Sequence, residues 1–88
     1  TMQIAVFDTY VRRNDGLLMH FDILVPAALN DQEAVLNYGR KYLAGKGISE
    51  ERLTTRECRF CHIESAPPEL EAIVNRDGYS ILEMENCS

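Results

Sequence analysis

The side chains best suited to metal or redox chemistry are concentrated in residues 57–62, which spell ECRFCH. Two of the three cysteines and one of the two histidines of the chain lie in this stretch. The Cys-x-x-Cys-His pattern is typical of three chemistries: attachment of a c-type haem, a thioredoxin-like redox pair, and half of a tetrahedral zinc site. Which of these applies depends on the elements that hold the stretch.

The haem and redox interpretations each lack a feature that they need. Attachment of a c-type haem normally requires export, and the sequence shows no signal-peptide pattern. In a thioredoxin-like pair, a helix N-terminus beside the first cysteine lowers its pKa. Here the next predicted helix begins only about five residues after Cys61. The sequence therefore gives little support to either interpretation.

A metal site meets a geometric difficulty if residues 53–64 form a strand, as their composition predicts. Residues three apart on a regular strand point to opposite faces, so Cys58 and His62 would share one face and Cys61 would lie on the other. A mixed site avoids this difficulty by combining both histidines with one cysteine and with Asp8 or Asp22, provided that the strand lies near the polar face of the hairpin. The candidate zinc ligands are therefore His20, Cys58, Cys61 and His62. The alternative is that the cysteines are ordinary buried side chains.

The first 25 residues predict a β-hairpin. Residues 2–13 and 17–25 are rich in β-branched and aromatic side chains, and the Asn14-Asp15-Gly16 segment between them suits a three-residue loop. In the resulting register one face is apolar throughout, which a one-residue shift would destroy. The predicted cross-strand pairs on that face are Val11–Met19, Thr9–Phe21, Phe7–Ile23 and Ala5–Val25.

The other face of this hairpin carries a group of polar side chains. The same register sets Tyr10 opposite His20 and Asp8 opposite Asp22. Two carboxylates directly across a ladder repel each other, so solvent, a proton, a cation or a basic neighbour must relieve the repulsion. We expect a binding cluster here, completed by the strand of residues 53–64. Its predicted members are Asp8, Tyr10, His20, Asp22, Cys58 and His62.

The remaining segments complete a β-β-α-β-α-β order. Asn30, with Glu33 three residues later, predicts the start of a helix over residues 31–44. A second helix is expected to open at residues 65–69 and to end at Asp77-Gly78, before a last strand over residues 79–85. We predict a single α+β domain, residues 1–88, with two layers: one mixed sheet with both helices on one face. Its last two strands would run parallel.

The net charge and the lengths of the apolar runs argue against several classes of function. The net charge of −5 argues against binding to nucleic acid or to an anionic membrane surface. No apolar run is long enough to span a bilayer, so we expect a soluble, cytoplasmic protein. Its cysteines are then reduced, and Cys87, near the chain end, is expected to be exposed.

Three separated blocks carry a family resemblance: residues 7–11 (FDTYV), 20–22 (HFD) and 57–62 (ECRFCH). Together with Asp77-Gly78-Tyr79 they resemble the signature of DUF2024, a family of NE1680-like small bacterial proteins of unknown function. The resemblance covers nearly the whole chain. It implies a compact α+β domain and no particular activity. The matching positions are Asp8, Tyr10, His20, Asp22, Cys58, Cys61 and His62.

Two functions remain open from the sequence. The first is a small binding or interaction domain that forms a homo-oligomer, because apolar Val6, Leu18 and Leu24 share the hairpin's polar face and would be left uncovered. Its small-molecule ligand is not identified. The second is a metal- or thiol-dependent enzyme that uses the residues proposed above as zinc ligands. The catalytic residues of such an enzyme are not identified.

Overall fold

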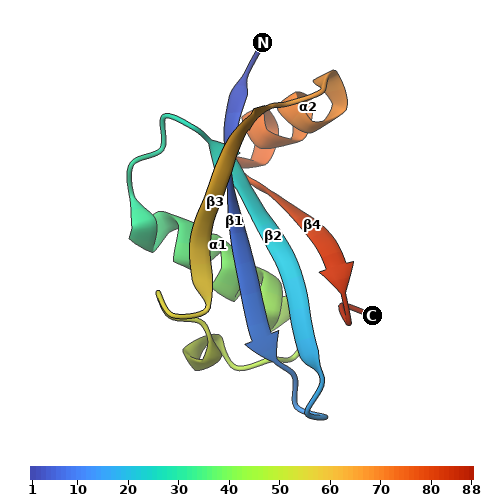
Figure 1. Cartoon of the computed structure of the whole chain (residues 1–88). Coiled ribbons are helices and arrows are strands. Elements are labelled where there is room, and N and C mark those ends of the chain that lie inside the picture. Colours follow the sequence, from blue (N-terminus) through green and yellow to red (C-terminus); the bar gives the residue numbers. More distant parts are fainter.

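A computed structural model describes all residues, 1–88, and builds them around one four-stranded sheet. The strand order is β3-β1-β2-β4, and every pair of neighbours is antiparallel (Figure 1). The α+β class and the β-β-α-β-α-β order are thus confirmed. The elements are β1 (Gln3–Arg12), β2 (Leu18–Pro26), α1 (Gln32–Gly45), the 3-10 helix η1 (Glu50–Arg52), β3 (Cys58–Ser65), α2 (Pro68–Asp77) and β4 (Ser80–Glu85).

The prediction of a mixed sheet was wrong. The β1–β2 hairpin occupies the centre of the sheet, and each later strand pairs with one of its arms: β3 with β1, and β4 with β2. Because the two arms run in opposite directions and each outer pairing is antiparallel, β3 and β4 also run in opposite directions. The connection through α2 therefore carries the chain from one edge of the sheet to the other (Figure 1).

The predicted hairpin register is confirmed at every position, including Tyr10 opposite His20 and Asp8 opposite Asp22. The loop is closed by Arg13, whose N–H donates to the carbonyl of Leu17 at 2.8 Å. Gly16 adopts φ +90°, the left-handed conformation that this loop requires. Local turn chemistry and the face pattern therefore specify the same pairing.

Helix α1 begins one residue later than predicted. Asp31, and not Asn30, caps it: the Asp31 carboxylate accepts the N–H of Ala34 at 3.2 Å. The helix ends in a Schellman arrangement, in which Gly47 has φ +74° and the N–H of Ile48 donates to the carbonyl of Leu43 at 3.0 Å. These caps fix the length of the helix that covers one face of the sheet.

The main core lies between α1 and the face of the sheet that we call the covered face. It is formed by the inward side chains of the hairpin and the apolar side of α1, among them Phe21, Ile23, Val25, Val35, Leu36 and Leu43. Gly39 allows the closest approach, because a Cβ there would lie 2.8 Å from Ile23 Cδ1 and 2.5 Å from Leu53 Cδ2. We call the opposite side of the sheet, which carries Asp8 and His20, the open face.

Strand β3 begins at Cys58, several residues later than predicted. Leu53, the predicted first residue of the strand, is fully buried but precedes a turn. The Glu57 carboxylate closes this turn by accepting both the N–H and the hydroxyl of Thr54 at 2.8 Å. The apolar pattern therefore detected the burial of Leu53 correctly, but that burial serves the loop after α1.

A β-bulge at Cys61 divides β3 into two halves. Phe60 pairs with Phe7 and His62 pairs with Val6, so Cys61 is an extra residue between them. In an antiparallel pair, directly opposed residues point to the same face. Phe60 therefore points to the covered face with Phe7, whereas His62 points to the open face with Val6. The bulge exchanges the faces of every later residue of the strand.

The prediction that both helices lie on one face was also wrong. Leu70 of α2 packs against a second apolar cluster, on the open face: Ile4, Val6, Leu24 and Ala66. The bulge is the physical reason, because in a regular strand Ala66 would share the face of Cys58. Helix α2 crosses the end of the sheet (Figure 1) and ends at Asp77, where Gly78 caps it with φ +88°. The rest of the open face has no helix over it.

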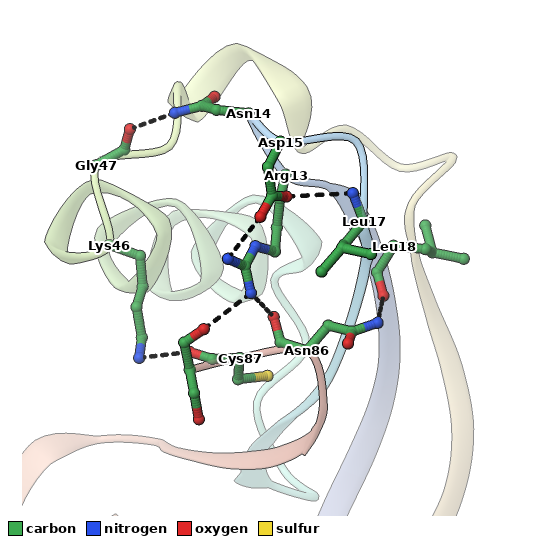
Figure 2. Close-up of polar contacts among 10 residues, drawn as sticks. Arg13, Asn14, Asp15, Leu17, Leu18, Lys46, Gly47, Asn86 and Cys87 are labelled. Carbon is green, nitrogen blue, oxygen red and sulfur yellow. Dashed lines mark hydrogen bonds and ion pairs between the residues drawn. The ribbon is translucent and has the colours of Figure 1, made fainter.

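The last residues of the chain are held between the hairpin loop and the end of α1 (Figure 2). Arg13 donates to the carbonyls of Asn86 and Ser88 at 2.9 Å, and Lys46 donates to that of Cys87 at 2.7 Å. The prediction that Cys87 is exposed was wrong, because it is 8% exposed and its thiol contacts the carbonyl of His20 at 3.2 Å. Neither helix is long and apolar enough to cross a bilayer.

Candidate functional site

The centre of the open face is a cluster of Asp8 from β1 with His20 and Asp22 from β2. His20 Nε2 lies 3.4 Å from Asp22 Oδ1 and 3.8 Å from Asp8 Oδ1. One ligand atom from each residue lies within 4.8 Å of the others. The register brings them together. Asp8 and Asp22 are directly opposed, and His20 lies two residues before Asp22 on β2, so its side chain points to the same face. We call these residues the Asp–His–Asp cluster.

The cluster is sheltered unevenly from solvent. The side chains of Asp22 and His20 are 11% and 18% exposed, whereas that of Asp8 is 40% exposed. The ring of Tyr10 stacks on the His20 imidazole with 4.2 Å between centroids and 12° between planes. This stacking holds the imidazole edge toward the two carboxylates. The cluster is consequently accessible from the side of Asp8.

Two buried atoms of the cluster have no hydrogen-bond partner: His20 Nε2 and Asp22 Oδ1. They face each other at 3.4 Å, beyond the usual range of about 2.7–3.2 Å for a hydrogen bond from nitrogen to oxygen. A buried polar group left without a partner costs about 1–3 kcal/mol. These two atoms therefore destabilise the folded protein, and a bound cation would remove this destabilisation.

The electrostatics of Asp22 favour the same interpretation. Burial raises the pKa of the Asp22 carboxyl, and the neighbouring Asp8 carboxylate raises it further, while His20 opposes both effects. A raised pKa means that the folded protein disfavours the ionised carboxylate. Additional positive charge between the two carboxylates would reverse this penalty.

The spacing of the donor atoms fits a small divalent ion. Ligand bonds of about 2.0–2.1 Å at tetrahedral angles place neighbouring nitrogen and oxygen donors about 3.3 Å apart. The separations of 3.4 and 3.8 Å between His20 Nε2 and the two carboxylate oxygens are close to this value, whereas the ligand atoms as a set lie within 4.8 Å of one another, so Asp8 and Asp22 would move closer together on binding. One imidazole and two carboxylates would leave a fourth coordination position for water or a ligand.

The structure separates the cysteines and histidine of the ECRFCH stretch. Cys58 is 3% exposed in the core of the covered face, so it cannot share an ion with His20 across the sheet. His62 is on the open face, but its Nε2 lies 2.7 Å from Glu64 Oε1 and its Nδ1 lies 3.2 Å from Cys61 Sγ. The expected pairing of Cys58 with His62 on one face was wrong, because the bulge exchanges the faces between them.

The two thiols of the stretch are not activated. Burial raises the pKa of the Cys58 thiol. Loss of solvation raises the pKa of the Cys61 thiol, and the negative charges of Asp8 and Asp22 add to this effect. A reactive thiol needs a lowered pKa. The two sulfurs also lie on opposite faces of the sheet, so the redox interpretation loses its geometric basis.

Two open hollows flank the Asp–His–Asp cluster. One, of about 300 Å³, lies beside α2 and contains Asp22 and Glu64 in a largely apolar lining that includes Leu24, Leu70 and Leu82. The other, of about 370 Å³, is lined by Asp8, Tyr10, Arg56, Glu57 and Arg59. The prediction missed Arg56, Arg59, Glu64 and Leu70 as lining residues. The bulge explains only the miss at Glu64, because Arg56 and Leu70 lie outside β3 and Arg59 precedes the bulge.

Comparisons with known proteins agree with this fold. A family model described as a domain of unknown function, DUF2024, matches residues 2–84. The solution NMR structure of protein NE1680 from Nitrosomonas europaea, a structural genomics target, is similar to this chain with a TM-score of 0.83 and 40% sequence identity. The match covers 99% of this chain and 100% of that one. No curated protein matches the chain in sequence.

Proposed function

Since the chain belongs to the DUF2024 family, whose description assigns no function, we propose a function from its geometry: a small binding domain that holds a divalent metal ion in the Asp–His–Asp cluster. The ligands are Asp8, His20 and Asp22, and the ion is of the zinc type. Carboxylates alone would suit calcium or magnesium, but an imidazole nitrogen favours zinc or a neighbouring transition metal.

One observation carries the proposal: His20 Nε2 and Asp22 Oδ1 are buried, face each other and lack any hydrogen-bond partner. A single ion would satisfy both atoms and neutralise the repulsion between Asp22 and Asp8. A proton on the imidazole is the competing occupant, since it would place a positive charge at the same point. The ion carries two positive charges and a chelator removes it, whereas the proton carries one and a higher pH removes it. A titration with metal therefore distinguishes the two occupants.

The test is a titration of zinc into untagged, chelator-treated protein, followed by calorimetry and by thermal unfolding. Zinc at about 100 times its dissociation constant would stabilise the fold by about 2.7 kcal/mol. This corresponds to a rise in Tm of about 10 °C or more for a domain of this size. We expect His20→Ala to abolish the rise and His62→Ala, a matched histidine on the same face, to retain it. Equal loss in both variants, or no rise in the unaltered protein, would rule the site out.

Cobalt substitution identifies the donor atoms. A site of one nitrogen and two carboxylates gives no thiolate-to-metal charge-transfer absorption, whereas a site that includes Cys58 or Cys61 does. We expect no such band, and no change in affinity when both cysteines are replaced by serine. A thiolate band lost in Cys61→Ser would show that the ligand set is wrong, because Cys61 borders the cluster through Asp8.

The sequence also predicts self-association, but the structure does not support the reason given for it, which was an uncovered apolar surface on the open face. Of the apolar residues thought to be left uncovered on the open face, Val6 and Leu24 are 2% and 5% exposed, beneath Ala66 and Leu70. Only Leu18, at 40%, is substantially exposed. The open face therefore no longer motivates the proposal, whereas the edge of β3 does.

A further inference from the structure

Strand β3 is an edge strand with an unusual distribution of side chains. It pairs with β1 on its inner side and has no strand on its outer side. Every residue after Cys58 is exposed, including Phe60 at 55% and Ile63 at 47%. Proteins usually protect such an edge with charged side chains, proline, a β-bulge or a covering segment, and of these β3 has the bulge at Cys61 and a few charged side chains. Residues 58–65 contain no lysine and no proline.

The backbone groups available at this edge follow from the bonds at its two ends. The N–H of Tyr10 donates to the carbonyl of Glu57 at 3.0 Å, and the N–H of Ala66 donates to that of Met2 at 2.9 Å. Hydrogen-bonded and non-bonded pairs alternate along an antiparallel ladder. The open-face residues of β3 therefore bond inward to β1. Phe60 and Ile63, on the covered face, direct both their N–H and their C=O groups outward.

We propose that two copies of this chain pair β3 with β3 about a two-fold axis that passes between Cys61 and His62. In this pairing Phe60 lies opposite the partner's Ile63, and each pair exchanges backbone hydrogen bonds in both directions. Arg59 lies opposite the partner's Glu64, whose carboxylate also contacts the His62 ring of its own chain, as Glu64 contacts His62 at 2.7 Å in this chain. The contact joins the two sheets into one continuous antiparallel sheet, a form of strand addition.

The bulge makes this register self-consistent. Opposed residues of an antiparallel pair must share a face. A regular strand can therefore pair with its own copy only when the two-fold axis passes level with a residue, and not between two residues. In β3 the extra residue changes the parity at the centre. With the axis between Cys61 and His62, Phe60 and Ile63 share the covered face, while Arg59 and Glu64 share the open face. Moving the axis by half a residue would oppose side chains from different faces, and among the registers that remain, this one sets Phe60 against Ile63 and Arg59 against Glu64.

The side chains along this edge are complementary to themselves. An aromatic residue meets a β-branched one, and a guanidinium meets a carboxylate, which are favourable cross-strand pairs. The other edge of the sheet differs, because β4 carries Glu83 and Glu85, which would repel their copies. Glu83 is also held by Lys46 at 3.1 Å. The proposed occupant of the β3 edge is therefore a second copy of the chain, independent of any ion in the Asp–His–Asp cluster.

Charge reversal tests the register. The expected result for the unaltered protein is a concentration-dependent dimer in sedimentation equilibrium from about 1 µM to 1 mM, the range of a small interface. Arg59→Glu and Glu64→Arg should each weaken dimerisation at least tenfold, because each opposes like charges. An equimolar mixture of the two variants should recover dimers, since each then meets its opposite. Recovery on mixing also shows that both variants are folded.

Cross-linking tests the geometry independently. In a background in which every native cysteine is replaced by serine, Phe60→Cys with Ile63→Cys places cysteines on directly opposed residues, about 5.5 Å apart between Cα atoms and within disulfide range. Oxidation should give a covalent dimer, and Leu82→Cys with Met84→Cys on β4 should not. A clean monomer at 1 mM, or dimers that survive both charge reversals and dissociate with Glu85→Arg, would overturn the proposal.

Discussion

Replacing Asp22 with asparagine should stabilise the metal-free protein. Asp22 is 8% exposed, its pKa is raised first by burial and then by Asp8, and one of its oxygens lacks a partner. Asparagine has nearly the same shape and carries no charge, so it removes both the desolvation cost and the repulsion. The buried carboxylate is therefore a cost to the fold that we attribute to binding.

The size of the gain follows from the distance between the carboxylates. Charges within 4.8 Å repel by about 1 kcal/mol in a water-like dielectric and about 3.5 kcal/mol at an effective dielectric constant of about 20. Because the Asp8 side chain is 40% exposed, solvent screens the pair and the lower part of this range applies. We expect a gain of about 1–2 kcal/mol, or about 5–10 °C in Tm, at pH 8.

The pH dependence has a definite sign. A raised folded-state pKa means that the native protein binds a proton at Asp22 more readily than the unfolded chain, so the wild type loses stability as the pH rises through that pKa. The difference in stability between Asp22→Asn and the wild type should therefore close as the pH falls toward 3.8, the ordinary pKa of an aspartate carboxyl. Thermal unfolding between pH 4 and 8, in the presence of a chelator, measures it.

Asp77→Asn is the matched control. The pKa of Asp77 is lowered by its bond to Arg76, so its carboxylate favours the fold at neutral pH and its removal should give no gain. With zinc present, Asp22→Asn should also lose the metal-induced rise in Tm. If Asp22→Asn lowers Tm in metal-free protein, the account of a strained, unpaired carboxylate is wrong.

Two further predictions concern packing and thiol chemistry. Gly39→Ala should destabilise the fold by up to about 2 kcal/mol in urea unfolding, because overpacking costs about 1–3 kcal/mol against a helix-propensity gain of about 1 kcal/mol. The new Cβ would meet fully buried Leu53 and Ile23; a net gain would mean that these side chains rotate away freely. Iodoacetamide should label Cys61 in the native protein, more slowly than a free thiol at pH 8, and Cys58 only in denaturant. Mass spectrometry would measure both rates, and rapid native labelling of Cys58 would contradict its burial.

The hairpin and its polar cluster could be predicted from the sequence because local signals agree there. The alternation of Met19, Phe21 and Ile23, the loop ending in Gly16 and the apolar face all require one register. The meeting of Asp8, His20 and Asp22 follows from that register alone. No long-range information was needed to find the candidate site.

The arrangement around β3 could not be predicted in the same way. The bulge at Cys61 has no glycine or proline to mark it, and a single extra residue exchanges the faces of all residues that follow. The same shift carries Ala66 and α2 to the open face. Errors in ligand pairing and in helix placement therefore have one common cause, a two-against-one pairing that only the neighbouring strand reveals.

The contacts that Arg13 and Lys46 make with the last three residues affect which positions can change during evolution. Arg13 and Lys46 bind main-chain carbonyls, which every amino acid possesses, so Ser88 could change freely without loss of the contact. Asn86 is less free, because it adopts φ +57° and its amide donates to the carbonyl of Leu18 at 2.8 Å. Among related chains, we expect the two basic residues and Asn86 to persist while the residue at position 88 varies. The last residues would then keep their position in the fold although the amino acid at position 88 changes.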